Sequence, residues 1–432
     1  MQLDEIYKLF LSNPAISTDS RDIKPNSIFF ALKGENFDGN AYAKSAIEKG
    51  ASYAIIDNNN FKIDDRYILV DNVLKTLQNL ANFHRKQMKA KIIGITGSNG
   101  KTTSKELINA VLSQKYATIY TKGNLNNHIG VPLTLLSLTK DTDIGIIEMG
   151  ANHPNEIKLL CEIAEPEFGI ITNIGKAHIE GFGNYEGVIN TKKELYDFLF
   201  TRNGIVFINF DNQLLMQINN AKEFYSYGKD STNYISGKLV SMNPFIKIEW
   251  SNRTNKSYQI QTNLIGSYNT DNVLAAILIG KYFNVEDSAI CSAIENYTPS
   301  NNRSQLIKGK SNNIVMDAYN ANPSSMEVAI KNFHEIDFPE KTLIIGDMLE
   351  LGVISETEHL TVTELISKLH FKNVFLVGKT FCKINNNSLY KTYCNVDELT
   401  IFLKQNPIQN NYILVKGSRG IKLEKVLEFI IA

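Results

Sequence analysis

Residues 92–103 join an apolar run, a glycine-rich turn and the start of a periodic helix. Residues 92–95 are an isoleucine-rich run typical of a buried parallel strand, and Leu107, Ala110 and Val111 have the spacing of one helix face. A glycine-rich turn in this position can direct backbone N–H groups toward a phosphate, and the helix N-terminus adds partial positive charge. The segment therefore predicts an α/β domain that binds a nucleoside triphosphate.

The turn is a short variant of the phosphate-binding loop. The general pattern has four residues between its glycines, whereas Gly97 and Gly100 have only two between them. Lys101 is expected to reach the β- and γ-phosphates, and the Thr102 hydroxyl to ligate Mg²⁺. The alternative is a chance glycine turn before an ordinary helix. The candidate nucleotide-binding residues of the loop are Gly97, Ser98, Asn99, Gly100, Lys101, Thr102 and Thr103.

Length and charge limit the classes of function. A chain of 432 residues is too long for one ordinary core. Lys plus Arg and Asp plus Glu both number 45, so no global field attracts nucleic acid or an anionic membrane. We therefore expect no nucleic-acid partner and no membrane insertion. The scattered cysteines form no CxxC pair, which argues against a zinc cluster or a secreted disulfide framework and favours the cytoplasm; they are Cys161, Cys291, Cys382 and Cys394.

Alternating strand and helix patterns predict an α/β fold with three domains. Residues 1–90 are expected to form a small N-terminal α/β domain, and residues 91–298 a central phosphate-loop domain with a doubly wound, mainly parallel sheet. Residues 299–432 are expected to form a C-terminal Rossmann-like α/β domain. The predicted strands are 27–32, 54–57, 92–95, 144–148, 169–172, 204–209, 314–317, 342–346, 373–377 and 412–416, and the predicted helices include 41–50 and 73–88.

Ligands bind at the carboxyl ends of strands in open α/β sheets, and two polar side chains are expected there. Glu148 ends the strand at 144–148 and would face the phosphate loop, where a carboxylate can hold Mg²⁺. The alternative is a surface glutamate at the start of a loop. His178 lies in the loop after the next strand, and taken alone such a histidine is more often an ordinary loop residue.

Several strings along the chain resemble the Mur ligase family, the ATP-dependent enzymes that form amide bonds in bacterial cell-wall synthesis. The central strings are GSNGKTT (97–103), EMGANHP (148–154) and ITNIGKAHIEGFG (171–183). TDSR (18–21) and FDGN (37–40) are similar to the uridine-nucleotide module of the family. The third domain carries KGSR (416–419). The resemblance implies an ATP-dependent ligase.

Three further strings are most similar to the branch of the family that adds D-alanyl-D-alanine to a UDP-N-acetylmuramoyl-tripeptide. They are GNLNNHIGVP (123–132), YNANP (319–323) and GDMLELG (346–352). The implied substrates are these two small molecules and ATP, used by a monomer through an acyl phosphate. The alternatives are a sister ligase or a folylpolyglutamate synthetase-like ligase, a phosphate-loop kinase or GTPase, and a non-catalytic relative that binds a uridine nucleotide.

The resemblance also implies two Mg²⁺ ions. Glu148 matches a ligand of the first ion, together with Thr102. His178 matches a ligand of the second ion, and Lys192 matches a lysine that the family converts to a carbamate. An unmodified ammonium cannot ligate Mg²⁺, whereas a carbamate supplies anionic oxygen. The family usually has glycine after this lysine and this chain has Lys193, so the assignment to Lys192 rests on the alignment of residues 186–188. The implied catalytic residues are Lys101, Lys192 and His178.

The remaining implied contacts lie in all three domains. Asn269 and Asn272 match adenine contacts, although the family commonly has a histidine where this chain has Tyr268, and Asn272 alone also suits a helix N-terminus. Arg303 is expected at a phosphate and Asp317 near the ribose. The implied substrate-binding residues are Ser20, Arg21, Asp38 and Gly39 for the uridine nucleotide, Asn320 and Asn322 for the dipeptide, and Asn124, Asn126 and Asn127 without assignment to one substrate.

Overall fold

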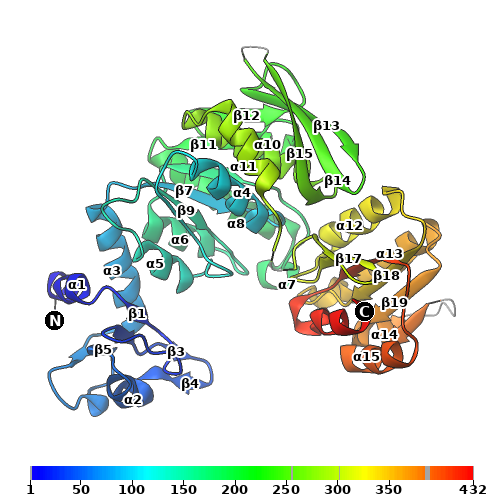
Figure 1. Cartoon of the computed structure of the whole chain (residues 1–432). Helices are drawn as coiled ribbons and strands as arrows, with labels where there is room; N and C mark the ends of the chain where they lie inside the picture. The colour runs from blue at the N-terminus through cyan, green and yellow to red at the C-terminus, as the bar shows by residue number, and fades with distance from the viewer. Residues whose placement is uncertain (1, 254–255, 301, 385–389, 432) are drawn as a thin grey trace. The chain divides into compact units, whose positions relative to one another are not determined.

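Mainly parallel sheets of four, nine and six strands, with helices between their strands, make up an α/β fold (Figure 1). The fold class predicted from the sequence is therefore confirmed. The computed structural model describes residues 2–253, 256–300, 302–384 and 390–431. The chain forms two compact units. One comprises the chain up to Ile95 with Tyr116–Ala151 and Asn155–Gly169, and the other comprises Thr96–Lys115, Asn152–Pro154 and the chain from Ile170 onward.

The first sheet is parallel, with the strand order β1-β2-β5-β6. Its core contains Phe29, Ala46 and Ala54, and the strands predicted at 27–32 and 54–57 are both present. A short hairpin leads into a 3₁₀ turn, η1 (Gly39–Tyr42). The elements are α1 (Leu3–Ser12), β1 (Ile16–Ser17), β2 (Ile28–Phe30), β3 (Lys33–Gly34), β4 (Phe37–Asp38), α2 (Ala43–Glu48), β5 (Tyr53–Ile56), β6 (Tyr67–Leu69) and α3 (Val73–Gln87).

The second sheet has the order β15-β14-β13-β12-β11-β10-β7-β9-β8. The pairs β7–β9, β8–β9, β11–β12 and β12–β13 are parallel, whereas β13–β14 and β14–β15 are antiparallel. The strands are β7 (Lys91–Thr96), β8 (Thr118–Tyr120), β9 (Ile144–Glu148), β10 (Phe168–Ile171), β11 (Ile205–Asn209), β12 (Glu223–Gly228), β13 (Ile235–Met242), β14 (Phe245–Asn252) and β15 (Ser257–Ile265).

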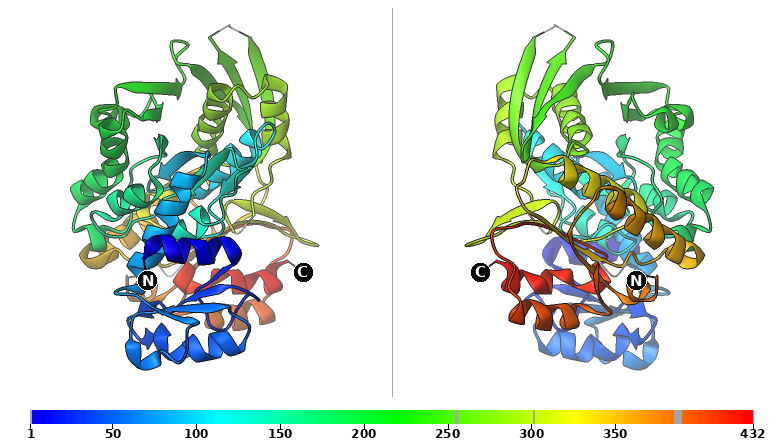
Figure 2. Two further views of the ribbon diagram at one scale, coloured as in Figure 1. Left: turned by 90° about the vertical axis from the view of Figure 1, so that its left-hand side faces the viewer. Right: turned by 90° about the vertical axis from the view of Figure 1, so that its right-hand side faces the viewer.

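Helices and the antiparallel ribbon complete this part of the chain. Strands β13–β15 form a long ribbon that the sequence did not predict (Figures 1 and 2). Helix α10 is buried along most of its length and lies against α4, which begins at the phosphate loop (Figure 1). The helices are α4 (Lys101–Leu112), α5 (Gly130–Leu135), α6 (Glu156–Ala164), α7 (Ile179–Phe182), α8 (Tyr185–Thr201), α9 (Gln213–Ile218), α10 (Asn269–Tyr282) and α11 (Asp287–Asn296).

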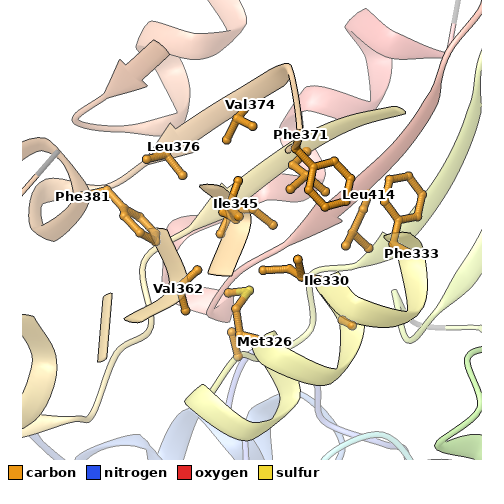
Figure 3. Close-up of a cluster of buried hydrophobic side chains, with 14 of the residues drawn as sticks. Met326, Ile330, Phe333, Ile345, Val362, Phe371, Val374, Leu376, Phe381 and Leu414 are labelled. Carbon is orange, nitrogen blue, oxygen red and sulfur yellow. The ribbon is translucent and has the colours of Figure 1, made fainter. Parts of the chain in front are cut away.

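The third sheet has the order β16-β17-β21-β18-β19-β20 and is parallel except for the pair β16–β17. Met326 and Ile330 of α12, Val362 of α13 and Phe381 of α14 surround Ile345 of β18 in its core (Figure 3). The elements are β16 (Gln305–Lys308), β17 (Asn313–Asp317), α12 (Pro323–Glu335), β18 (Lys341–Gly346), α13 (Ser355–Lys368), β19 (Asn373–Val377), α14 (Lys379–Ile384), β20 (Lys391–Tyr393), α15 (Val396–Gln405), β21 (Tyr412–Lys416) and α16 (Leu427–Ile430).

A disulfide bond and the character of the helices can be compared with what the composition led us to expect. Cys382 of α14 and Cys394, which follows β20, form a disulfide with a Cα–Cα distance of 5.6 Å. We did not expect this bond, because the cysteine spacing indicates no pair. Within the described ranges, no helix combines the length and the apolar character that a membrane span requires.

Candidate active site

The phosphate loop connects β7 to α4, as the sequence predicted. Gly97 and Gly100 have φ angles of 144° and 78°, in the region that favours glycine. A Cβ atom at Gly97 would lie 2.0 Å from Oγ1 of Thr172, and one at Gly100 would lie 2.7 Å from Oδ1 of Asn272. Both glycines are therefore required by the backbone conformation and by the closeness of their neighbours.

Hydrogen bonds join the phosphate loop to the segment that follows β10. The backbone N–H of Ser98 donates to the carbonyl of Asn173 at 2.9 Å, and the N–H of Asn99 donates to the Asn173 side chain at 3.0 Å. The carbonyl of Asn99 accepts from Thr172 Oγ1 at 2.6 Å and from Asn173 Nδ2 at 3.0 Å. Ser98 Oγ donates to the carbonyl of Gly175 at 3.0 Å. These bonds fix the loop's shape.

The ammonium of Lys101 lies against carbonyls of the same loop. Its Nζ donates to Gly97 O at 2.6 Å and to Ser98 O at 3.3 Å. Thr102 is only 3% exposed and Thr103 is half-buried, and both lie in the first turn of α4. A cation beside the N-terminus of a helix suits an anionic phosphate group.

Glu148 is the last residue of β9 and is 2% exposed. The strand register pairs it with Ile95, which lies two residues before Gly97 in the chain. Its Oε1 accepts a hydrogen bond from Asn126 Nδ2 at 2.8 Å. The structure thus buries this carboxylate instead of placing it on the surface, and it brings Asn126 to it.

The other two asparagines of the GNLNN string have different surroundings. Asn127 Oδ1 accepts from the backbone N–H groups of Ile129 and Gly130, at 3.1 and 2.9 Å, at the start of α5. Asn124 is exposed. Of these three predicted substrate-binding residues, Asn126 is the one whose hydrogen bond to another predicted site residue, Glu148, the structure describes.

His178 and Lys192 contact the same aromatic ring. His178 immediately precedes α7 and its ring centroid lies 6.5 Å from that of Phe182. Lys192 is on α8, is 2% exposed, and its Nζ lies 5.4 Å from the Phe182 centroid. Lys193 instead forms an ion pair with Asp197 one turn further along α8 and is about one-third exposed. This arrangement favours Lys192 over Lys193 as the partner of His178.

The unmodified side chains offer little to a metal ion. In the part of the chain that the structure describes, no cluster of three or more His, Cys, Asp or Glu side chains could hold one. A carbamate on Lys192 would add the anionic oxygen that a Mg²⁺ ion beside His178 requires. Lys192 is buried and lies over the Phe182 ring that His178 also contacts.

His178 also contacts Glu350, which lies in the loop after β18. Its Nδ1 is hydrogen-bonded to Oε2 of Glu350. This bond lowers the pKa of the Glu350 carboxyl, which is therefore ionised near neutral pH. We did not predict a role for Glu350, although it belongs to the GDMLELG string. Strand pairing and loop packing that bring it to His178 cannot be seen in one sequence.

Asn269 and Asn272 are buried and bonded to each other at the start of α10. Asn272 Nδ2 donates to Asn269 Oδ1 at 2.8 Å, and Asn269 Nδ2 donates to the carbonyl of Ile265 at 2.8 Å. Asn272 Oδ1 accepts from Ser104 of α4 at 2.9 Å. Both asparagines therefore already support the packing of α10 against the phosphate-loop helix.

Arg303 and Asp317 lie near each other in the third-sheet region. The Arg303 guanidinium stacks on Tyr319 at 3.7 Å from the ring centroid, and its buried Nε has no hydrogen-bond partner among the described residues. Asp317 accepts from the N–H of Ser304 at 3.1 Å and from Nζ of Lys416 at 2.6 Å. Lys416, 2% exposed, was not predicted as a site residue. Its position follows from the pairing of β17 with β21.

Asn322 links α12 to the phosphate loop. Its Oδ1 caps α12 by accepting from Ser325 N–H at 2.9 Å, and its Nδ2 donates to Asn99 Oδ1 at 2.8 Å. The side chain of Asn320 accepts from the N–H of Ala321 at 2.9 Å. The structure therefore brings Asn322, but not Asn320, to the phosphate loop.

The predicted uridine-nucleotide residues lie in the part of the chain with the four-stranded sheet. Arg21 is exposed and forms a bidentate pair with Asp19, and the hydrogen bonds from Arg21 lower the pKa of Asp19 to about 2. Ser20 is half-buried. Asp38 caps η1, and a Cβ at Gly39 would lie 2.3 Å from a backbone oxygen. Asp38 and Gly39 thus have local structural roles in addition to any ligand contact.

Family models and known proteins match almost the whole chain. The models described as Mur ligase family, catalytic domain, Mur ligase middle domain, and Mur ligase, glutamate ligase domain match residues 14–94, 95–280 and 302–419. A UDP-N-acetylmuramoyl-tripeptide–D-alanyl-D-alanine ligase of Bacillus subtilis is 34% identical, covering 99% of this chain and 97% of the relative. The chain belongs to the Mur ligase family.

Solved Mur ligase structures are similar over the same length. A MurF structure from Acinetobacter baumannii has a TM-score of 0.87 and 28% identity, covering 96% of this chain and 93% of that one. The MurF ligase of Thermotoga maritima, solved in complex with ADP, has a TM-score of 0.85 and 25% identity, covering 97% of both chains. A folylpolyglutamate synthase from T. maritima, at 12% identity and a TM-score of 0.59 over 82% of this chain and 92% of that one, shares the fold alone.

Proposed function

We propose that this Mur ligase adds D-alanyl-D-alanine to UDP-N-acetylmuramoyl-tripeptide with hydrolysis of ATP, giving the UDP-linked pentapeptide used for peptidoglycan synthesis. The observation that carries this proposal is the 34% identity, over almost the full length of both chains, to a relative with that name. The complete phosphate loop, with Lys101 held inside it, supports catalysis over a purely binding role. Sister ligases that add a single amino acid are the second candidate.

ATP is proposed to bind at residues 97–103. Lys101 would neutralise the γ-phosphate, and Arg303, whose buried Nε has no partner among the described residues, would contact a phosphate from the third domain. Asn269 and Asn272 would lie at adenine, and Asp317 near the ribose. ADP in the T. maritima structure supports nucleotide binding by this fold.

Two Mg²⁺ ions are proposed, the first held by Thr102 and Glu148 and the second by His178 and a carbamate on Lys192. Bound Mg²⁺ would neutralise phosphate charge. The burial of Glu148 and Lys192 and the position of His178 beside Phe182 support this set of residues.

The chain is proposed to work as three domains, 1–90, 91–298 and 299–432. Ser20, Arg21, Asp38 and Gly39 would bind the uridine nucleotide. Asn124, Asn126 and Asn127 would contact a substrate, and Asn320 and Asn322 would contact the dipeptide. We place the enzyme in the cytoplasm as a monomer with small-molecule substrates and no nucleic-acid partner. The three matched family models support the division into domains.

The proposed reaction has two steps. The acceptor carboxylate attacks the γ-phosphorus of ATP and ADP leaves, with Lys101 neutralising charge on the transferred phosphoryl group. The free amine of the dipeptide then attacks the acyl carbon, and phosphate leaves through a tetrahedral intermediate. Water would hydrolyse the acyl phosphate, so closure of the third domain is needed to exclude it. We assign no base for the amine.

The activity is tested by phosphate release from ATP with purified protein. We expect release to require both UDP-N-acetylmuramoyl-tripeptide and D-alanyl-D-alanine, with the pentapeptide nucleotide as product. Acceptors that carry diaminopimelate or lysine as their third residue are tested separately, since the sequence does not distinguish them. Release with glutamate, or with a single amino acid and a shorter acceptor, would instead identify a folylpolyglutamate synthetase-like enzyme or a sister ligase.

Replacing Arg21 should separate acceptor binding from ATP binding. Arg21→Ala is expected to raise the acceptor KM by about 10- to 100-fold, because the variant loses the binding free energy of a charge-assisted contact to the uridine nucleotide. The KM for ATP should stay near its wild-type value, because the lost contact belongs to the other substrate. Both constants are measured by phosphate release.

Arg66 provides a matched control for this variant. It makes the same bidentate pair with a carboxylate two residues earlier, Asp64, and is also exposed. Arg66→Ala should leave both KM values unchanged. Equal rises in the two KM values for Arg21→Ala would contradict the acceptor assignment.

A further inference from the structure

A hydrogen bond of Tyr268 crosses from the start of α10 to the segment that leads into the third sheet. Tyr268 immediately precedes α10, and its hydroxyl is hydrogen-bonded to Oγ of Ser304 at 2.6 Å. The backbone N–H of Ser304 in turn donates to Oδ1 of Asp317 at 3.1 Å. Asp317 ends β17 and is the proposed ribose contact. Two hydrogen bonds thus connect the start of the helix that carries Asn269 and Asn272 to a candidate nucleotide residue of the third sheet.

Ser304 has an unusual backbone conformation. Its φ angle is 48°, in the left-handed region that serine seldom adopts, and the residue is 8% exposed. Such conformations persist where the surrounding structure over-determines them, and they are concentrated at functional sites. Ser304 directly follows Arg303, the proposed phosphate contact, whose guanidinium stacks on Tyr319. The turn that carries Arg303 is therefore held in place by the bonds of Ser304.

The ring of Tyr268 has a defined place beside Gly266. Gly266 has a φ angle of 94°, and a Cβ atom there would lie 2.2 Å from Cε1 of Tyr268, so a larger residue would displace the ring. On the other side of Tyr268, Asn272 of α10 accepts a hydrogen bond from Ser104 of α4, the helix that begins at the phosphate loop. The Tyr268 hydroxyl is therefore fixed relative to the phosphate-loop helix.

We propose that Tyr268 is a positioning residue for the nucleotide. Its hydroxyl holds Ser304, and Ser304 holds Arg303 and Asp317 in the places from which they contact a phosphate and the ribose. This inference rests on the proposed function, which assigns those two contacts to ATP. Tyr268 acts through Ser304 and not by touching the nucleotide. Nucleotide affinity thereby depends on one hydrogen bond between the start of α10 and the segment before β16.

A second contact between the same two parts of the chain allows this role to be separated from simple anchoring. Oδ1 of Asn332, on α12, accepts hydrogen bonds from the backbone N–H and the hydroxyl of Ser267 at 2.7 and 2.8 Å. If Tyr268 served only to anchor the third-sheet region to α10, loss of either contact would have similar consequences. If it positions Ser304, only loss of the bond between Tyr268 and Ser304 weakens nucleotide binding.

Two variants remove the bond and two serve as controls. Tyr268→Phe removes the hydroxyl and keeps the ring, and Ser304→Ala removes its partner. Asn332→Ala removes the second contact. Tyr258→Phe removes a half-buried tyrosine hydroxyl of β15 that is hydrogen-bonded to Asp287, and so measures the effect of this chemical change elsewhere. Thermal unfolding of each purified full-length protein checks that it is folded.

The first readout is affinity for ADP, measured by isothermal titration calorimetry. We expect Tyr268→Phe and Ser304→Ala each to weaken ADP binding by about 5- to 20-fold. The double variant should lose little more than either single variant, because both remove the same hydrogen bond. Asn332→Ala and Tyr258→Phe should bind ADP like the wild-type protein. Wild-type affinity in both bond-deleting variants, or an equal loss in Asn332→Ala, would overturn the proposal.

The second readout compares the substrates. The KM for ATP should rise in Tyr268→Phe, whereas the KM for D-alanyl-D-alanine should stay near its wild-type value. An equal rise in both constants would indicate general anchoring and contradict the positioning role.

Arg303→Ala and Asp317→Ala test the proposed function separately, since each should also weaken ADP binding. If both bind ADP like the wild-type protein, the nucleotide contacts of the proposed function are wrong, and the inference falls with them. If they bind ADP weakly while Tyr268→Phe and Ser304→Ala bind it normally, the inference alone is wrong.

Discussion

Lys101→Ala is expected to lower turnover by about a thousand-fold or more, because the transferred phosphoryl group loses a cation that neutralises its charge. The lysine lies in the phosphate loop with its ammonium 2.6 Å from the carbonyl of Gly97. It starts a helix and is half-buried, so the fold should survive. Phosphate release under saturating substrates measures the loss, and thermal unfolding checks the fold.

Lys115 is the control for removal of a positive charge. It is exposed beyond the other end of α4. Lys115→Ala should turn over at a rate close to wild type. An active, folded Lys101→Ala enzyme would exclude ATP chemistry at this loop and with it the whole nucleotide-site assignment.

Lys192→Ala should lose activity by about a hundred-fold or more, since the second Mg²⁺ would lack an anionic oxygen ligand. Loss alone would be ambiguous, because Lys192 is buried and its truncation can disturb packing. Small carboxylic acids such as formate or acetate supply the missing oxygen donor. We therefore expect either acid to restore part of the activity in a concentration-dependent way.

The adjacent lysine gives this experiment its matched control. Lys193 pairs with Asp197 on the more exposed side of α8. Lys193→Ala should remain active and should not respond to acid. Rescue of Lys193→Ala instead would shift the assignment by one residue. No rescue of either variant, with a bare amine at position 192 in high-resolution density, would exclude the carbamate.

Local sequence pattern was sufficient for much of the sheet architecture. The runs at 92–95, 144–148 and 342–346 are short and apolar, and each becomes a buried parallel strand. The phosphate loop was also predictable, because glycine, lysine and threonine at fixed spacing occur between a strand and a helix. These signals depend only on neighbouring residues.

The antiparallel ribbon β13–β15 was missed although one of its strands has a local signal. Ile246, Ile248 and Trp250 of β14 are buried and alternate with Lys247 and Glu249, and this period of two is typical of a half-buried antiparallel strand. A search for continuous apolar runs, which are typical of buried parallel strands, does not find such a segment.

The long-range contacts of the candidate site could not be predicted from a single sequence. Asn322 meets Asn99, Lys416 meets Asp317, and Glu350 meets His178, each pair separated by about a hundred residues or more. Strand order and loop packing bring these side chains together. The sequence motifs identified most of these residues, whereas the contacts between them are visible only in the structure.

The hydrogen bonds between the phosphate loop and residues 172–175 join groups of the protein itself. A loop held by such internal bonds loses less conformational freedom on binding a ligand than an unsupported loop would, so part of the entropy of shaping it is spent during folding. Nucleotide affinity in this protein therefore depends also on side chains such as Asn173, which is hydrogen-bonded to the backbone of the loop. Selection for tight nucleotide binding then acts on the folding stability of this region as well as on residues that touch the phosphates.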